Sequence, residues 1–151
     1  MINPRYRPGP YQLILVSMAL FVVFAFIVSS PRDIFEGLFR IFTTPGLLTT
    51  DFIDVGGLGA AIVNAAVTGV CMVVLMRLTG AKANGAICMA IWLTAGFSFF
   101  GKTVVSMAPI IVGVWLYARL QKEPFINYSL TALLSSTLAP VVSQIGFSPI
   151  F

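Results

Sequence analysis

Apolar residues fill most of this chain in long runs, which charged residues interrupt only at intervals. A helix needs about 20 residues to cross the hydrocarbon core of a bilayer, and runs of near that length occur five times. We predict transmembrane helices at about residues 11–28, 55–76, 85–101, 103–118 and 125–145. The pattern therefore predicts an all-α membrane protein in which residues 1–151 form a single membrane domain.

A further segment, residues 31–43, is amphipathic rather than apolar throughout. Its apolar residues recur at spacings of three and four, which places them on one helical face. They are Ile34, Phe35, Leu38, Phe39, Ile41 and Phe42. Pro31 favours the start of a helix, and Pro45 followed by Gly46 favours its end. The pattern predicts a helix that either lies at the outer membrane interface or packs on the other helices as a lid, and both readings stay open.

Composition agrees with a lipid environment. Of the 151 residues, 58% are apolar and only 9% are charged, whereas a soluble domain carries about 25% charged residues. The basic residues are scattered singly, which argues against nucleic-acid binding. The chain has no histidine, and its two cysteines lie inside apolar runs, so we expect no enzyme, no cofactor and no metal site.

Lysine and arginine positions predict the orientation, because these residues concentrate in cytoplasmic loops. If the N-terminus is cytoplasmic, the outer segments hold only Arg32, Arg40 and Lys102. The inner segments then hold Arg5, Arg7, Arg77, Lys82, Arg119 and Lys122. With five crossings, this excess predicts a cytoplasmic N-terminus and a C-terminus on the outer side.

The first polar group in an apolar context surrounds Asp51 and Asp54, which precede a glycine-rich helix start. One interpretation is capping, with Asp54 as the N-cap; the other is a site for a cation or proton. Further along the same run, Asn64 and Thr68 form a polar pair, while Ala61, Ala65 and Gly69 form a ridge of small residues that favours close helix packing.

The second polar group is a stripe of Thr94, Ser98 and Lys102, four residues apart. The two runs that meet at Lys102 are short, and Pro109 and Gly113 interrupt the second. Short, interrupted segments are typical of substrate sites built from re-entrant or broken helices. The alternative is a pair of tilted spans with Lys102 at the outer interface, where it could pair with Asp51 or Asp54.

The third polar group is a ridge in the last run. Asn127, Thr131 and Ser135 share one face, and Ser143 continues it. Such a ridge either lines a polar path or hydrogen-bonds to neighbouring helices.

The stretches DVGGLGAAIVNA and GFSFFGKTVVSMAPIIVGVWLYARL resemble a family of uncharacterised bacterial multi-pass membrane proteins, a domain of unknown function whose longer members carry this block twice. The resemblance covers most of the chain from about residue 10. It implies a bacterial inner-membrane location and a single block, completed by a second copy or by a homo-oligomer. Because five spans place the two ends on opposite sides, a second copy in the same chain would insert inverted, and we expect one repeat of an inverted pair. The resemblance implies no substrate.

Two functions follow as hypotheses. The first is half of a small-solute transporter or channel, and its path would be lined by Asn64, Thr68, Thr94, Ser98, Lys102, Asn127, Thr131 and Ser135. Asp51 or Asp54 would hold a coupling ion, and the scarcity of ionisable groups favours a neutral solute. The second is a non-transporting scaffold or assembly subunit, which needs only the packing motifs. A membrane-embedded enzyme ranks third.

Overall fold

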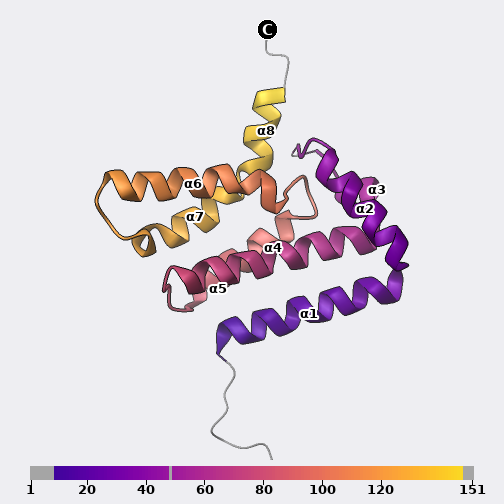
Figure 1. Ribbon diagram of the computed structural model, residues 1–151, viewed down its shortest axis with the longest axis horizontal. Coiled ribbons are helices and arrows are strands. Elements are labelled where there is room, and N and C mark those ends of the chain that lie inside the picture. Colours follow the sequence, from indigo (N-terminus) through magenta and orange to yellow (C-terminus); the bar gives the residue numbers. More distant parts are fainter. Residues whose placement is uncertain (1–8, 48, 148–151) are drawn as a thin grey trace, which may run out of the picture.

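The computed structural model describes residues 9–47 and 49–147, and its regular elements there are all helices (Figure 1). This confirms the predicted all-α class. Arg5 and Arg7, which entered the orientation argument, lie outside the described residues. The elements are α1 Pro10–Val28, α2 Pro31–Thr43, α3 Phe52–Gly56, α4 Leu58–Leu78, α5 Gly85–Phe97, α6 Val104–Leu120, the 3₁₀ helix η1 Phe125–Tyr128, α7 Ser129–Ser136 and α8 Ala139–Phe147.

Two of the described helices, α1 and α4, are long and apolar enough to cross a membrane. Helices α5 and α6 are apolar but shorter, with 13 and 17 residues. The fifth predicted span is broken, because η1 and α7 together make an angle of 55° with α8. Pro140, in the first turn of α8, has no N–H with which to continue the ladder of α7. The described residues thus contain two candidate spans, or three if the bent pair counts as one.

Helix α4 is the centre of the bundle, and most of its residues are buried. The predicted ridge of small residues lies in this buried set, with Ala61 and Ala65 fully covered. At Gly69 an added Cβ would lie 2.8 Å from the Met18 side chain of α1. The ridge therefore brings α1 and α4 into close contact, as small residues do in membrane bundles.

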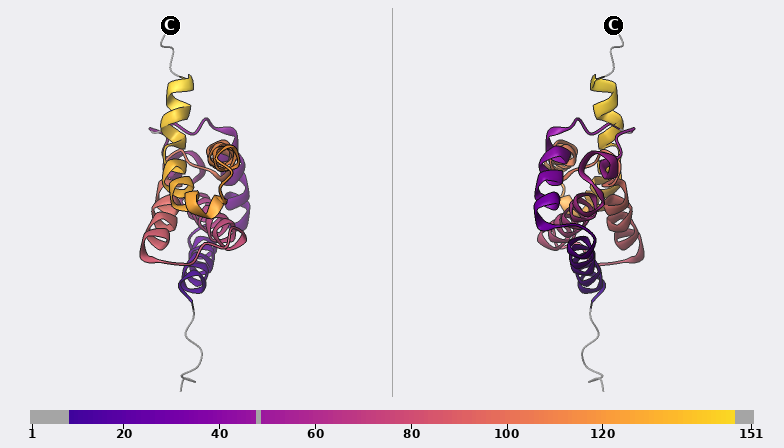
Figure 2. Two further views of the ribbon diagram at one scale, coloured as in Figure 1. Left: turned by 90° about the vertical axis from the view of Figure 1, so that its left-hand side faces the viewer. Right: turned by 90° about the vertical axis from the view of Figure 1, so that its right-hand side faces the viewer.

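Helix α1 buries one narrow face, formed by Ile14, Met18 and Ala25. The rest of its surface is apolar and exposed, for example at Leu20 and Ile27. In water this face would be unfavourable, but lipid chains cover it without penalty. Helices α1 and α8 lie at opposite extremes of the molecule (Figure 2).

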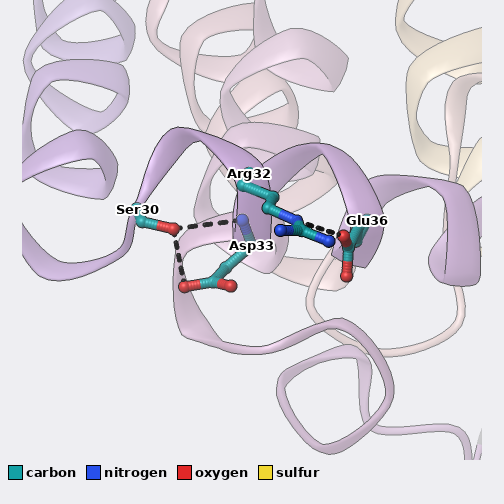
Figure 3. A network of polar contacts seen from close by, with 4 residues as sticks. All are labelled: Ser30, Arg32, Asp33 and Glu36. Carbon is teal, nitrogen blue, oxygen red and sulfur yellow. Dashed lines mark hydrogen bonds and ion pairs between the residues drawn. The ribbon is translucent and has the colours of Figure 1, made fainter.

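Helix α2 spans the residues predicted for the amphipathic helix. Ser30 is its N-cap and accepts a hydrogen bond from the Asp33 amide at 3.3 Å, and its hydroxyl donates to the Asp33 carboxylate at 2.8 Å (Figure 3). Arg32 and Glu36 form an ion pair at 2.8 Å on the exposed face. Exposed pairs of this kind contribute little to stability; the cap and Pro31 define the helix start.

The apolar face of α2 divides into two parts. Ile34, Gly37 and Ile41 are buried against neighbouring residues of α3 and α4. Its three phenylalanines are exposed instead: Phe35, Phe39 and Phe42. The helix therefore packs on the bundle with one part of this face and presents an aromatic surface outward with the other, and its place at the outer interface stays a prediction.

Helix α4 begins three residues later than the sequence predicted. Asp51, not Asp54, is the N-cap, and it caps the separate short helix α3 by accepting from the Ile53 amide at 2.8 Å. Gly57 then ends α3 and precedes α4 with φ of +84°. A residue with a Cβ is strained at this backbone angle, so glycine here allows the chain to break and start a new helix.

Helices α5 and α6 form a hairpin that starts and ends at the same end of the bundle (Figure 1). At that end, Leu78 and Thr79 of α4 line a cavity with Trp115 of α6 and Phe125 of η1. At the other end of the hairpin, residues 98–103 form a tip that packs against α4. The pair is thus a helix–loop–helix that turns back inside the bundle.

We expect the close approach of α2 to α3 to be sensitive to one methyl group. A Cβ at Gly37 would lie 2.0 Å from the Gly56 carbonyl oxygen, which is backbone and cannot rotate away. Gly37→Ala should therefore lower stability by about 1–3 kcal/mol, the usual effect of overpacking. Thermal unfolding in detergent would measure it.

Gly113→Ala is the matched control, because Gly113 is also inside a helix and has open space around its Cα. Its stability should stay equal or rise, since alanine is the better helix former. Equal melting of Gly37→Ala and Gly113→Ala would contradict the close α2–α3 contact.

Candidate functional site

The polar residues predicted for α4 and for the second polar group come together at the hairpin tip. Asn64, Thr68, Thr94, Ser98 and Lys102 are all buried. The Asn64 side-chain amide donates to the Ser98 carbonyl at 2.7 Å and to the Lys102 carbonyl at 2.9 Å. These bonds satisfy carbonyl groups that the end of α5 and the loop after it leave without helical partners.

The tip lies inside the length of α4 rather than beyond it. Asn64 is six residues from the start of α4, and the rest of the helix, to Leu78, rises about 21 Å at about 1.5 Å per residue. The 13 residues of α5 rise about 20 Å, so they reach the level of Asn64 and stop there. If α4 crosses a membrane, the tip therefore lies within its hydrocarbon core.

Lys102 extends from the tip to α7 and is fully buried. Its ammonium donates to the Ser136 hydroxyl at 3.0 Å. Among the described residues the ion pair is Arg32–Glu36, so the hypothesised pairing of Lys102 with Asp51 or Asp54 is not formed. Of the two readings that the sequence left open for Lys102, the structure agrees with a place inside the bundle rather than at the outer interface.

Ser136 is the last residue of α7, so Lys102 joins two places where helices break. The Ser136 hydroxyl donates to the Leu133 carbonyl at 2.7 Å, which leaves its oxygen free to accept from Lys102. The C-terminal end of a helix carries partial negative charge, which favours a cation at this position. Hydroxyl and helix end together offset only part of the ammonium charge, and a buried charge without a full counter-charge is unfavourable.

Three buried polar atoms near this region have no hydrogen-bond partner among the described residues. They are the Asn64 side-chain oxygen and the hydroxyl oxygens of Thr68 and Thr94. The Thr94 carbonyl is engaged, because the Ser98 hydroxyl donates to it at 3.0 Å. A buried polar atom left without a partner costs about 1–3 kcal/mol, so these three atoms are a source of instability in the interior of the bundle.

The connection between α2 and α3 covers the tip. Phe52 donates its amide to the Phe99 carbonyl at 2.9 Å, and Asp51 and Phe100 form an isolated antiparallel bridge. Gly46 and Gly101 meet backbone to backbone: a Cβ on Gly46 would lie 2.0 Å from the Gly101 carbonyl oxygen. Gly101 also has φ of +66°, so glycine is needed there for conformation as well as space.

The two acidic residues predicted to bind an ion lie outside this buried region. Asp51 is occupied as the N-cap of α3. Asp54 is exposed and lines a cavity of about 290 Å³ with Asp33, Glu36 and Arg40. In the part of the chain that the structure describes, no group of three acidic or thiol side chains is arranged to hold a metal ion.

The polar ridge of the last run lies on the outside of the molecule. Asn127 and Thr131 are exposed and Ser135 is half-buried. Asn127 contacts Glu123 at 3.4 Å, and the Ser135 hydroxyl donates to the Thr131 carbonyl of its own helix. The inward polar residues of α7 are Ser129 and Ser136, which the sequence analysis did not select. Their seven-residue spacing, one face of a helix, was the available signal.

One family model matches the chain over residues 30–151, and its description is "Protein of unknown function (DUF1576)". The chain belongs to this family. The match includes α2, the hairpin with its buried lysine and the broken last segment, and therefore all the residues of the candidate site. No curated protein and no solved structure shows significant similarity to the chain.

The two bonds of Asn64 should hold the hairpin tip in place. Asn64→Ala removes both and leaves the buried carbonyls of Ser98 and Lys102 without these donors, so we expect a stability loss of about 2–6 kcal/mol, at about 1–3 kcal/mol per group. Hydrogen exchange should accelerate in residues 98–103 before it does in α4.

Asn127→Ala is the control, since that amide is exposed and its one contact is long. It should change neither unfolding temperature nor exchange at the tip. Unchanged exchange of residues 98–103 in Asn64→Ala would show that the tip does not depend on Asn64.

Proposed function

We propose that this chain is half of a membrane transporter for small solutes, with the solute site where the α5–α6 hairpin meets the break between α7 and α8. The observation that carries the proposal is the contact between Lys102 and Ser136. It joins two helix interruptions inside the bundle, next to three buried polar atoms without partners.

Helices that are interrupted within a membrane are rare unless the interruption has a function. Each break exposes backbone groups that lipid cannot satisfy, so breaks occur where they line a cavity or a binding site. Secondary transporters place such breaks near the midplane, where helix ends and backbone groups contact the substrate. The depth of the tip along α4 fits this arrangement.

The count of crossings supports a second, inverted copy. On this proposal α1 and α4 cross, the hairpin returns to its own side, and the bent last segment counts as one span and makes a third crossing. Three crossings, like the five expected from the sequence, place the two ends on opposite sides of the membrane. A second block following in the same chain would therefore insert in the inverted orientation.

The exposed ridge on η1 and α7 indicates where the second half would lie. Polar side chains at membrane depth face protein or a polar path rather than lipid. Asn127 and Thr131 are exposed and Ser135 is half-buried, and we propose that a second copy of the block, within a longer chain or in a homo-oligomer, covers this ridge.

Charges and aromatic residues at one end of the bundle support a cytoplasmic N-terminus in a bacterial inner membrane. Arg77 lies 5.8 Å from the Tyr11 ring centre, and Arg119 lies 5.0 Å from that of Trp115. The Tyr11 hydroxyl also donates to the Ala81 carbonyl at 2.9 Å, which joins the start of α1 to this end. Basic residues mark the cytoplasmic side, and aromatic residues mark an interface.

The second candidate function is a membrane scaffold or assembly subunit. It is favoured by the bonds of Asn64, which serve the stability of the hairpin and need no solute. Neither candidate involves catalysis, and the contact of the Lys102 amine with the Ser136 hydroxyl is assigned in both to joining the two helix ends.

Replacing Thr68 and Thr94 should affect solute flux and the free energy of unfolding differently. The hydroxyls of Thr68 and Thr94 have no partner, so replacing both residues by the isosteric valine should leave stability equal or raise it by about 1 kcal/mol. If these hydroxyls contact the solute, flux should fall by about tenfold or more. Uptake of radiolabelled acetate, lactate, succinate, alanine and glucose into proteoliposomes would measure it.

Thr43→Val is the control, because that hydroxyl is exposed and bonds within its own helix. Its flux should match that of the unmodified chain. Uptake of none of these solutes by properly inserted protein, together with intact assembly, would instead favour the scaffold.

The position of the hairpin tip within the membrane can be tested by labelling single cysteines with a membrane-impermeant maleimide. Cys71 and Cys88 are first replaced by alanine. Arg32→Cys and Lys82→Cys should react from opposite sides of the membrane, because they lie at opposite ends of α4. Lys102→Cys should react from neither side until detergent unfolds the protein. Reaction of Lys102→Cys from the side of Arg32 would mean that α5 and α6 both cross completely.

A further inference from the structure

We propose that the Lys102 ammonium binds the carboxylate of a small organic acid, and that this is the class of solute the site takes. The inference rests on the proposed function for the identity of the site. It departs from the neutral solute favoured by the sequence, because that expectation rested on the scarcity of ionisable groups, and the structure buries one such group, Lys102, inside the bundle.

The first argument is charge. The Lys102 side chain is fully buried, and its partner is a neutral hydroxyl. The carboxylates nearest in the chain are engaged or exposed: Asp51 caps α3, and Asp54 faces an open cavity. A buried ammonium is stable when an anion with good geometry neutralises it. A bound carboxylate would supply the missing charge.

The second argument is the helix that follows. Thr103 is the N-cap of α6, and its hydroxyl and that of Ser106 satisfy each other's backbone amides. The amides of Val104 and Val105 have no partner among the described residues. Free amides at a helix N-terminus attract anions. They lie two and three residues after Lys102 in the chain, so the helix start that carries them begins beside the residue that supplies the ammonium.

The third argument limits the charge and shape of the solute. One ammonium matches the single charge of a carboxylate better than the double charge of a phosphate. The unpartnered Asn64 oxygen can only accept a hydrogen bond, so it suits a hydroxyl or N–H on the remainder of the acid. The hydroxyls of Thr68 and Thr94 can donate or accept. A short hydroxy acid meets these requirements.

The experiment compares lactate with lactamide, its neutral amide of nearly the same shape, on the full chain in detergent. Trp92 of α5 and Trp115 of α6 lie on the two arms of the hairpin, so tryptophan fluorescence reports its thermal unfolding. At constant ionic strength, sodium lactate should raise the unfolding midpoint, and lactamide should not. Equal shifts with lactate and lactamide, or a shift with inorganic phosphate alone, would overturn the proposal.

Lys102→Met removes the charge while keeping much of the side-chain volume. We expect it to unfold at a higher temperature than the unmodified chain without ligand, because an uncompensated charge is gone. We also expect its apparent affinity for lactate to be about tenfold weaker or lost. Lys122→Met, a change at an exposed lysine, should keep the lactate response; a full response in Lys102→Met would contradict the inference.

If Lys102→Met does not fold, the comparison of lactate with lactamide on the unmodified chain decides by itself. The outcomes also separate this inference from the proposed function. Uptake of neutral solutes without lactate binding would leave transport standing and remove the carboxylate site. Lactate binding without flux of any solute would leave the carboxylate site standing and remove transport.

Discussion

The bundle depends on one constraint, which is that backbone carbonyls at a broken helix end must be satisfied away from water. Asn64 meets it by donating to the carbonyls of both Ser98 and Lys102. Because those bonds fix the hairpin tip against α4, they also fix where α6 begins and where the Lys102 side chain enters the bundle. The burial of a lysine is therefore a consequence of how the hairpin ends, more than of any attraction of its own.

The arrangement depends both on short helices, which end inside the bundle, and on small residues, which allow close packing around those ends. Helix α5 stops at the level of Asn64, and α7 stops at Ser136, so two incomplete helices share the space that one spanning helix would fill. The glycines at the tip allow the α2–α3 connection to close over it. Polar groups thus occupy the middle of the bundle while α1 presents an almost wholly apolar surface. Polarity in this bundle is therefore concentrated in the interior, the reverse of its distribution in a water-soluble protein.

The sequence predicted those features that depend on local pattern. The residues of α2 follow from Pro31 and a clear three- and four-residue period, and the α1–α4 contact follows from the small residues around Gly69. The buried polar stripe of Thr94, Ser98 and Lys102 was also visible. Hydropathy alone did not separate the long helices from the short ones, because α5 and α6 are apolar helices like the candidate spans α1 and α4. The partner of Lys102 depends on a contact with Ser136, 34 residues away, which no local pattern encodes.

The meeting of Gly46 and Gly101 has a mechanical consequence. Their backbones touch at a distance that leaves no room for a side chain on either, and the bridge of Asp51 to Phe100 adds a second attachment beside it. The tip therefore cannot shift toward the α2 side without carrying the α2–α3 connection with it. Helix α2, with its outward phenylalanines, is attached in this way to the centre of the bundle. A displacement of α2 is therefore coupled to a displacement of the segment around Lys102.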